Sequence, residues 1–209
     1  ASPKHLSINV CVLGEAFKDR VFYRTGAKPG DQIFVTGNLG DSAMGLKILR
    51  EKIKKPGSIK HKNTLVKKHL EPIPRVKESS LLARSKLKIT SMIDISDGLT
   101  QDLGHLSTEN NLGANLYEDR LPASKALLNV CFQKKYNPID WILQGGEDYE
   151  LLFTIKPEDV KNLKKLFLKA NVFVSHIGEI TKSPKKIILI KGNGSKIPLK
   201  AATGFNHFK

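Results

Sequence analysis

The sequence contains few of the residues that build disulfide frameworks or structural metal sites. Its 209 residues include two cysteines, Cys11 and Cys131, which lie far apart and belong to no Cys-x-x-Cys or Cys/His cluster. This pattern excludes a disulfide scaffold and argues against a structural zinc site. We expect both cysteines to be buried free thiols of a protein in the reducing cytoplasm.

Long apolar runs are missing as well. No stretch approaches the ~20 residues of a membrane span, and residues 1–5 are not followed by the apolar core of a secretory signal. An alternating run from Leu6 to Leu13 predicts a strand almost at the start of the chain. Because the chain opens just before a strand and lacks an initiator methionine, we expect it to be part of a longer protein.

Acidic residues are scarce relative to basic ones. The chain has 35 Lys and Arg against 20 Asp and Glu, which gives a formal net charge of +15. Such a balance can mark a nucleic-acid-binding module, but the lysines do not interleave with aromatic residues and no RRM, KH or zinc-finger signature is present. We interpret most lysines as solvated surface residues that can also steer anionic substrates.

Apolar patterning predicts an α+β fold, a mixed α/β sandwich in which helices flank a mixed sheet. The expected strands cover residues 6–13, 32–36, 89–95, 113–117, 149–155, 172–177, 186–190 and 195–199. The expected helices cover residues 43–51, 62–70, 77–86, 98–110, 124–131 and 157–170, the first of them capped by Asp41 or Ser42. This prediction rests on strands and helices that alternate without a strict βαβ rhythm.

The segment Asp94-Ile-Ser-Asp97-Gly-Leu99 places two carboxylates, a serine and a glycine where a strand runs into a helix. Carboxylate oxygens are the ligands that Mg²⁺ prefers, and free N–H groups at a helix N-terminus bind phosphate. The turn therefore predicts a magnesium–phosphate site. The alternative is that Asp94 or Ser96 only caps the helix.

A second motif, Gly145-Gly-Glu147-Asp148-Tyr-Glu150, precedes an apolar strand. Paired glycines let the backbone bend or approach a ligand closely. Three acidic residues at the start of an apolar strand are hard to explain by packing. The alternative is an ordinary Gly-Gly turn with a solvated acidic rim.

Three further residues are candidates of lower specificity. Arg24 lies on a glycine-containing loop and suits bidentate phosphate binding. Phe205, in the C-terminal Gly204–Phe208 segment, either covers a ligand or pins the tail to the core. His105, within the helix after the acidic turn, is interpreted as a polar helix-face residue rather than a base.

Together these motifs resemble the thiamine-monophosphate kinase family in both content and order. The matching segments are Arg24-x-Gly-Ala-Lys-Pro-Gly-Asp31, Val35-Thr-Gly-x-Leu-Gly-x-Ser-Ala-x-Gly-Leu46, His69-x-x-Pro-x-Pro-Arg75, Asp94-Ile-Ser-Asp-Gly-Leu-x-x-Asp-Leu103, Gly145-Gly-Glu-Asp-Tyr-Glu-Leu151 and Gly204-Phe-x-His-Phe208. The resemblance spans essentially the whole chain. The Gly-Gly-Glu-Asp-Tyr-Glu-Leu block is its most specific part, since the acidic turn is shared more loosely with aminoimidazole-ribonucleotide-synthetase-like relatives.

The resemblance implies ATP-dependent phosphorylation of thiamine monophosphate to thiamine diphosphate, assisted by several Mg²⁺ ions and without a covalent enzyme intermediate. The matching residues imply the following roles: Mg²⁺ binding by Asp94 and Asp97, phosphate binding by Ser96 and Arg24, and thiamine binding by Glu147 and Phe205.

The family also carries an N-terminal domain with further metal-binding aspartates, and it forms homodimers. The resemblance therefore implies that residues 1–20 are the last strand of an N-terminal ATP/Mg-binding domain and a linker. Residues 21–209 would be the C-terminal domain, inactive when isolated. Two alternatives stay open: a sister ATP-dependent enzyme acting on another small substrate, and a basic nucleic-acid-binding module.

Overall fold

The centre of the molecule is a mixed seven-stranded sheet with the order β2-β4-β1-β5-β3-β6-β7. The structure is a computed structural model that describes residues 8–16, 18–51 and 62–200. Among the strand pairs of the described residues, only β3 and β6 are parallel. The strands are β1 (Gln32–Thr36), β2 (Ile89–Ile95), β3 (Gly113–Tyr117), β4 (Glu150–Ile155), β5 (Val174–Thr181), β6 (Ile187–Ile190) and β7 (Lys196–Leu199).

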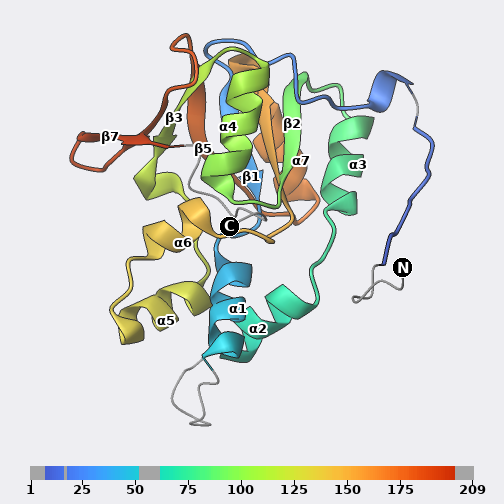
Figure 1. Ribbon diagram of the computed structural model, residues 1–209. Coiled ribbons are helices and arrows are strands. Elements are labelled where there is room, and N and C mark those ends of the chain that lie inside the picture. Colours follow the sequence, from blue (N-terminus) through green and yellow to red (C-terminus); the bar gives the residue numbers. More distant parts are fainter. Residues whose placement is uncertain (1–7, 17, 52–61, 201–209) are drawn as a thin grey trace, which may run out of the picture.

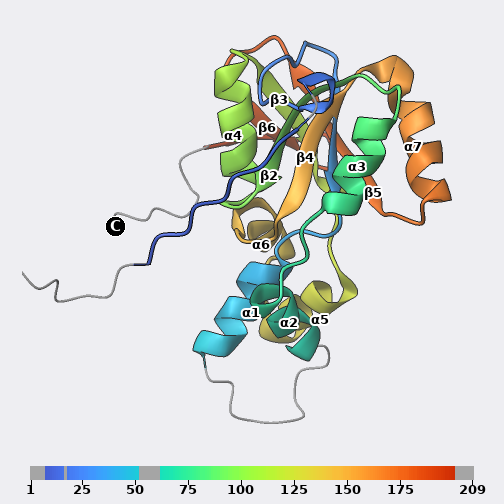
Figure 2. The ribbon, with the colours of Figure 1, turned by 90° about the vertical axis from the view of Figure 1, so that its right-hand side faces the viewer.

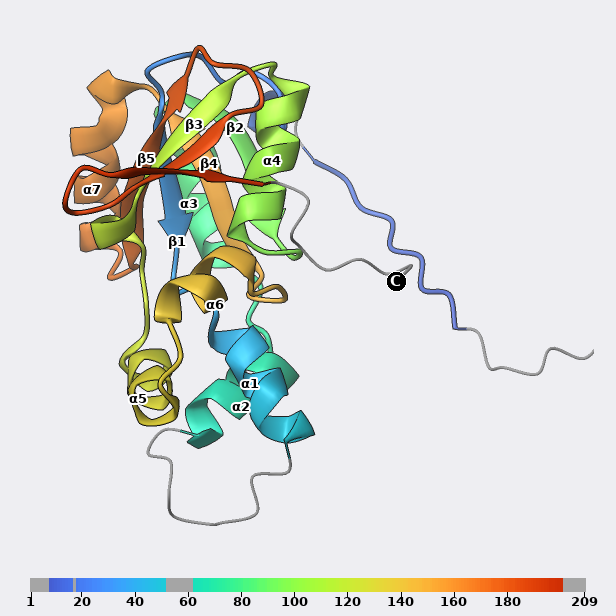
Figure 3. The same cartoon turned by 60° about the vertical axis from the view of Figure 1, so that its left-hand side comes forward.

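Helices cover both faces of this sheet and extend beyond one of its ends. Helix α4 lies on one face, while α3 and α7 lie on the other (Figure 2). Helices α1, α2, α5 and α6 gather below the sheet (Figures 1 and 3). The helices are α1 (Asp41–Arg50), α2 (Lys62–Leu70), α3 (Val76–Arg84), α4 (Leu99–Glu109), α5 (Lys125–Lys134), α6 (Pro138–Gln144) and α7 (Val160–Lys169), with short 3-10 turns η1 (Lys18–Arg20), η2 (Glu118–Arg120) and η3 (Pro157–Asp159).

Strand β1 shows why this arrangement is stable. Successive side chains of a strand point to opposite faces, so Ile33 and Val35 enter the core that includes α4, whereas Phe34 enters the core that includes α3 and α7. All three are fully buried. A central strand that is apolar on both faces requires a helical layer on each side, and the fold supplies both. The predicted α+β class is confirmed.

One helix is not predicted from the sequence. Helix α6 begins after Asn137, whose side-chain oxygen accepts a hydrogen bond from the backbone N–H of Ile139, and Pro138 occupies its first turn. Asn followed by Pro is a recognised helix start, so the signal is present in the sequence. The short length of the helix, seven residues, conceals it.

The predicted N-terminal strand does not form in the part that the structure describes. Residues 8–16 have no strand pairing, and Ile8, Val10 and Val12 are 76%, 84% and 87% exposed. A strand requires a neighbouring edge to satisfy its backbone, and no described strand lies beside this segment. Cys11 is likewise exposed, against expectation, whereas Cys131 is buried; both are free thiols. None of the described helices is long and apolar enough to span a membrane.

Candidate functional site

The structure brings the two acidic motifs together at one edge of the sheet. Strand β2 ends in the acidic turn, and its antiparallel partner β4 begins with the glycine-acid block. The backbone N–H of Glu147 donates to the carbonyl of Ser96 at 2.8 Å, and that of Tyr149 donates to Ile95 at 2.9 Å. A Cβ on Gly146 would lie 2.6 Å from the Ser96 carbonyl oxygen, so this close approach requires glycine.

The acidic turn differs from expectation in one respect. The buried carboxylate of Asp102 accepts hydrogen bonds from the backbone N–H groups of Ser96, Asp97 and Gly98 at 3.1, 3.0 and 3.1 Å. These groups were expected to be free for phosphate, but Asp102 occupies them from the first turn of α4. Burial raises the pKa of Asp102 to about 6, and the nearby Asp97 carboxylate acts in the same direction. An acidic residue in the first helical turn is the signal for this role.

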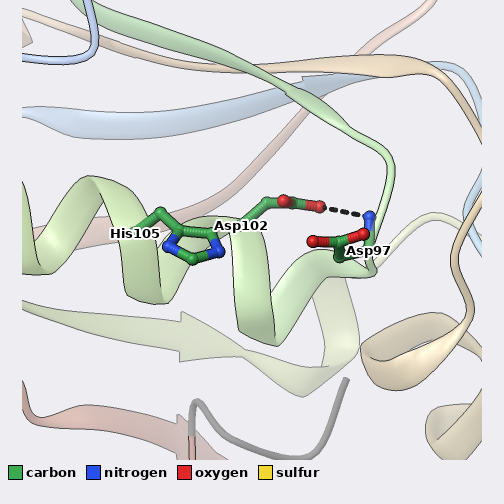
Figure 4. A group of neighbouring side chains, drawn as sticks. All are labelled: Asp97, Asp102 and His105. Carbon is green, nitrogen blue, oxygen red and sulfur yellow. Dashed lines mark hydrogen bonds between the residues drawn. The ribbon is translucent and has the colours of Figure 1, made fainter. Parts of the chain in front are cut away.

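Three potential ligand groups converge beside this turn. Asp97, Asp102 and His105 each offer one ligand atom, and these atoms lie within 4.8 Å of one another (Figure 4). Asp97 also accepts a hydrogen bond from the side chain of Gln101 at 3.0 Å. Asp94 is not part of this group, but its side chain is exposed on edge strand β2. Because carboxylate oxygens suit a hard divalent cation, the exposed carboxylate of Asp94 and the half-buried carboxylate of Asp97 fit Mg²⁺, whereas Asp102 is buried and already bonded to three N–H groups.

The three acids of the glycine-acid block occupy different environments. Glu147 has a half-exposed side chain and a positive φ of 63°, whereas Asp148 and Glu150 are fully buried. The block is therefore not a simple acidic rim. Only Glu147 among these acids is open to a ligand.

Asp148 serves as the cap of helix α1. Its carboxylate accepts hydrogen bonds from the backbone N–H groups of Gly40 and Ser42, at 2.6 and 3.1 Å. Burial raises the pKa of Asp148 to about 7, although these hydrogen bonds act in the opposite direction. Asp41, one of the two caps expected from the sequence, has another role: its carboxylate accepts a hydrogen bond from Ser124 at 2.6 Å.

Glu150 is held by a basic clamp. The guanidinium of Arg75 binds its carboxylate with two hydrogen bonds. Lys68 Nζ lies 2.9 Å and Thr36 Oγ1 2.7 Å from the same carboxylate. These partners satisfy a charge that would be costly to bury alone. The His69-x-x-Pro-x-Pro-Arg75 segment thus contributes to the structure of the block.

Helix α2 reaches Glu147 as well. Nδ1 of His69 lies 3.3 Å from Oε2 of Glu147 and 3.0 Å from Oγ of Ser42. Sequence reasoning singles out neither His69 nor Ser42 as a site residue, because their contacts join segments far apart along the chain.

Arg24 lies away from the acidic turn. Its guanidinium is 3.6 Å from the carboxylate of Glu109, and its carbonyl oxygen accepts a hydrogen bond from the side chain of Asn110 at 2.8 Å. Both partners are at the C-terminal end of α4, and an 11-residue helix is about 16 Å long. The structure therefore does not bring Arg24 to Asp97. Phe205 lies outside the described residues.

A cavity of about 450 Å³ opens on another side of Gly145, lined by residues of α1, of α6 and of the segment before α6. Its aromatic wall is the pair Tyr136 and Trp141, whose ring centroids are 5.9 Å apart. None of the predicted site residues within the described part of the chain lines this cavity.

Comparison with known proteins places the fold and these motifs in a family. Residues 28–191 match the family described as "AIR synthase related protein, C-terminal domain", and the chain belongs to it. The thiamine-monophosphate kinase of Buchnera aphidicola subsp. Schizaphis graminum (strain Sg) is 40% identical over 203 residues, which are 97% of this chain and 60% of that protein. This similarity confirms the resemblance noted in the sequence.

Solved structures agree with this assignment. A structure described as "AaThiL complexed with AMPPCP and TMP" has a TM-score of 0.72 and 31% identity, over 88% of this chain and 53% of that one. The thiamine-monophosphate kinase of Stenotrophomonas maltophilia K279a has a TM-score of 0.74 and 29% identity, over 83% and 54%. The present chain thus spans somewhat more than half the length of these three proteins.

Proposed function

We propose that this chain is the C-terminal part of a thiamine-monophosphate kinase. In the reaction, a phosphate oxygen of thiamine monophosphate attacks the γ-phosphorus of ATP. The bond between this phosphorus and the oxygen bridging to the β-phosphate breaks, and ADP and thiamine diphosphate form. The observation that carries the proposal is that the acidic turn and the glycine-acid block lie side by side, joined by the hydrogen bond from the backbone N–H of Glu147 to the carbonyl of Ser96. The similarity to thiamine-monophosphate kinases over 97% of the chain supports it.

Phosphoryl transfer requires that two anionic substrates be positioned in line and their charge neutralised. We assign Asp94 and Asp97 to bind Mg²⁺, which when bound would neutralise phosphate charge. Ser96 has a half-buried side chain beside them and would contact the ATP phosphates through its hydroxyl, since its N–H is already bonded to Asp102.

We assign binding of the thiamine part of the substrate to the neighbouring glycine-acid block. The exposed carboxylate of Glu147 accepts hydrogen bonds from the aminopyrimidine in this proposal, and Phe205 walls in the ring. Arg24 would bind nucleotide phosphate. Because Arg24 lies at the far end of α4, we propose that it acts at a junction with another domain or subunit.

The domain organisation belongs to the proposal too. Residues 1–20 would complete an N-terminal ATP/Mg-binding domain, residues 21–209 form the C-terminal domain, and the whole protein would be a homodimer. The exposed apolar side chains of residues 8–13 support this division, since they have no covering layer in the described structure. We also propose a cytoplasmic location, consistent with ATP as co-substrate and with two free thiols.

A substrate panel tests the function. The purified full-length gene product is incubated with Mg-ATP and thiamine monophosphate, thiamine, aminoimidazole-ribonucleotide precursors or selenide, and ADP release is measured. Thiamine monophosphate should be the substrate that is turned over. Turnover of another substrate alone would favour a sister enzyme of the family.

The nucleic-acid alternative rests on the net charge of +15 alone. It predicts binding of a labelled duplex that weakens steeply with added salt. We expect no specific complex at physiological salt.

A further inference from the structure

Glu147, the acid assigned to the substrate, is held by a residue from a distant part of the chain. Its carboxylate oxygen Oε2 lies 3.3 Å from Nδ1 of His69, which is located near the end of α2. The Glu147 side chain is 52% exposed and that of His69 is 15% exposed. A largely buried imidazole thus faces a carboxylate that remains open to a ligand.

His69 is itself fixed on two sides. Its Nδ1 lies 3.0 Å from Oγ of Ser42 on α1. Helices α1 and α2 approach closely at Gly45, where a Cβ would lie 2.2 Å from the Leu65 carbonyl oxygen and 3.1 Å from the His69 Cβ. A largely buried side chain that is closely packed and hydrogen-bonded has few alternative rotamers.

The contacts close into a ring. Asp148 accepts from the backbone N–H of Ser42, Ser42 contacts His69, and His69 contacts Glu147, which is bonded to Asp148 along the chain. The backbone of Glu147 is fixed in addition, because its N–H donates to Ser96 at 2.8 Å. Both ends of this side chain, the backbone and the carboxylate, are therefore positioned before any ligand binds.

The ring of contacts also favours one tautomer of His69 over the other. An ionised carboxylate can only accept hydrogen bonds. If Nδ1 of His69 were the unprotonated nitrogen, its lone pair would face the negative charge of Glu147. The tautomer with hydrogen on Nδ1 avoids this repulsion, and in that tautomer Nδ1 faces both Glu147 Oε2 at 3.3 Å and Ser42 Oγ at 3.0 Å. This arrangement leaves Oε1 of Glu147 unoccupied by His69.

We propose that His69 is a positioning residue that orients the carboxylate of Glu147 for the thiamine half of the substrate. The inference rests on the proposed function and deepens it, because it separates the residue that contacts substrate from the residue that prepares it. A preorganised carboxylate loses less side-chain freedom on binding. Removing His69 should therefore weaken binding of thiamine monophosphate and leave phosphoryl transfer from bound ATP largely intact.

The test is steady-state kinetics of the full-length protein with both substrates varied. His69→Ala should raise KM for thiamine monophosphate about 10-fold or more, with KM for ATP and kcat within about 3-fold of wild type. His69→Asn should recover most of the loss, because its amide N–H lies near the position of Nδ1. Lys67→Ala, on the same helix with a 72% exposed side chain, should behave like wild type.

A double mutant shows whether His69 acts through Glu147. In a Glu147→Gln background, His69→Ala should add no further increase in KM, since the carboxylate that it positions is already gone. Additive increases would overturn the inference. Parallel changes in both KM values and kcat, together with a lower unfolding temperature, would likewise overturn it and indicate a merely structural residue.

Two further outcomes separate the inference from the function. A wild-type protein that makes thiamine diphosphate while His69→Ala leaves KM unchanged would overturn the inference alone. A wild-type protein without this activity would overturn the proposed function and the inference with it. If His69→Ala does not fold, Ser42→Ala, which removes the hydroxyl contact to the ring, should still raise KM for thiamine monophosphate about 3-fold; an unchanged KM would overturn the inference.

Discussion

Burial divides the acidic side chains near the sheet edge into a buried group and a solvent-exposed group. Asp148 and Glu150 are fully buried, and their carboxylates are bonded to Ser42 of α1, to Lys68 of α2 and to Arg75, which precedes α3. Glu147 and Asp94 are open to solvent. Residues of one chemical type, close together in sequence, therefore hold the fold at some positions and face the solvent at others.

The buried carboxyl of Asp148 should make stability depend on pH. Burial raises its pKa in the folded protein from the ordinary value of 3.8 to about 7. Between about pH 4 and 7 the folded state thus retains a proton that the unfolded state has released. The contribution of this group to stability falls as pH rises through that window, by at most about 1.4 kcal/mol per pH unit.

Urea unfolding of wild type and Asp148→Asn at several pH values measures this effect. The free energy of unfolding of wild type, relative to that of the variant, should decrease from about pH 5 to 7 and level off above. A difference that stays constant across this range would contradict the raised pKa.

The clamp on Glu150 gives a second prediction. Arg75→Ala leaves the buried carboxylate with Lys68 and Thr36, and should lower the free energy of unfolding by about 3 kcal/mol. Arg84→Ala, which removes an exposed arginine at the end of α3, should change it by less than about 0.5 kcal/mol. Equal stabilities of the two variants by denaturant unfolding would show that the clamp is not needed for the fold.

The candidate site is only partly predictable from these residues. The motifs around Asp97 and Glu147 are visible because acids and glycines cluster locally. The sequence analysis misses the roles of Asp102 and Asp148 in capping α4 and α1. The hydrogen bond from Gly40 to Asp148 joins residues more than a hundred positions apart in the sequence. Hydrogen bonds between distant segments depend on packing, which spacing alone does not reveal.

At the scale of elements, the pairing of α1 with α2 positions the site. Helices α1 and α2 carry Ser42, Lys68 and His69, which contact the glycine-acid block. The strands and most helices are predicted from apolar patterning, which reports burial directly. Helix α6 is missed because its seven residues show too little periodicity. Residues 8–13 are predicted as a strand from their apolar alternation, but this pattern does not show whether a neighbouring strand is present to pair with them.

Gly45→Ala tests the α1–α2 contact. In a helix interior this change ordinarily stabilises by about 1 kcal/mol. Here the added Cβ would lie 2.2 Å from the Leu65 carbonyl oxygen, so we expect destabilisation by about 1–3 kcal/mol. Gly192→Ala, where a Cβ meets nothing within 4 Å, is the control. A higher melting temperature for Gly45→Ala would contradict the close packing.

At the scale of the whole molecule, the described domain would, in our proposal, present one side of an active site. Asp94, Asp97 and Glu147 lie at the same end of the β2–β4 pair, whereas Arg24 contacts the far end of α4. The relatives are longer, since the chain spans 60% of the Buchnera protein. Catalysis therefore belongs, in our proposal, to the assembled full-length protein.

A direct comparison of the two forms follows from this division. The isolated 209-residue chain should convert thiamine monophosphate at least about 100-fold more slowly than the full-length protein, because much of the charge neutralisation is lost. Both are assayed for thiamine diphosphate at equal molar concentration. Equal turnover would show that this domain is sufficient.

The most direct test of the account concerns Asp97 in the full-length protein. Asp97→Asn removes a proposed Mg²⁺ ligand and should lower kcat for thiamine diphosphate formation by at least about 100-fold. Asp119→Asn, an exposed position in η2, should leave kcat unchanged. Near-normal turnover by a folded Asp97→Asn variant, at saturating Mg-ATP, would contradict the role of the acidic turn in catalysis.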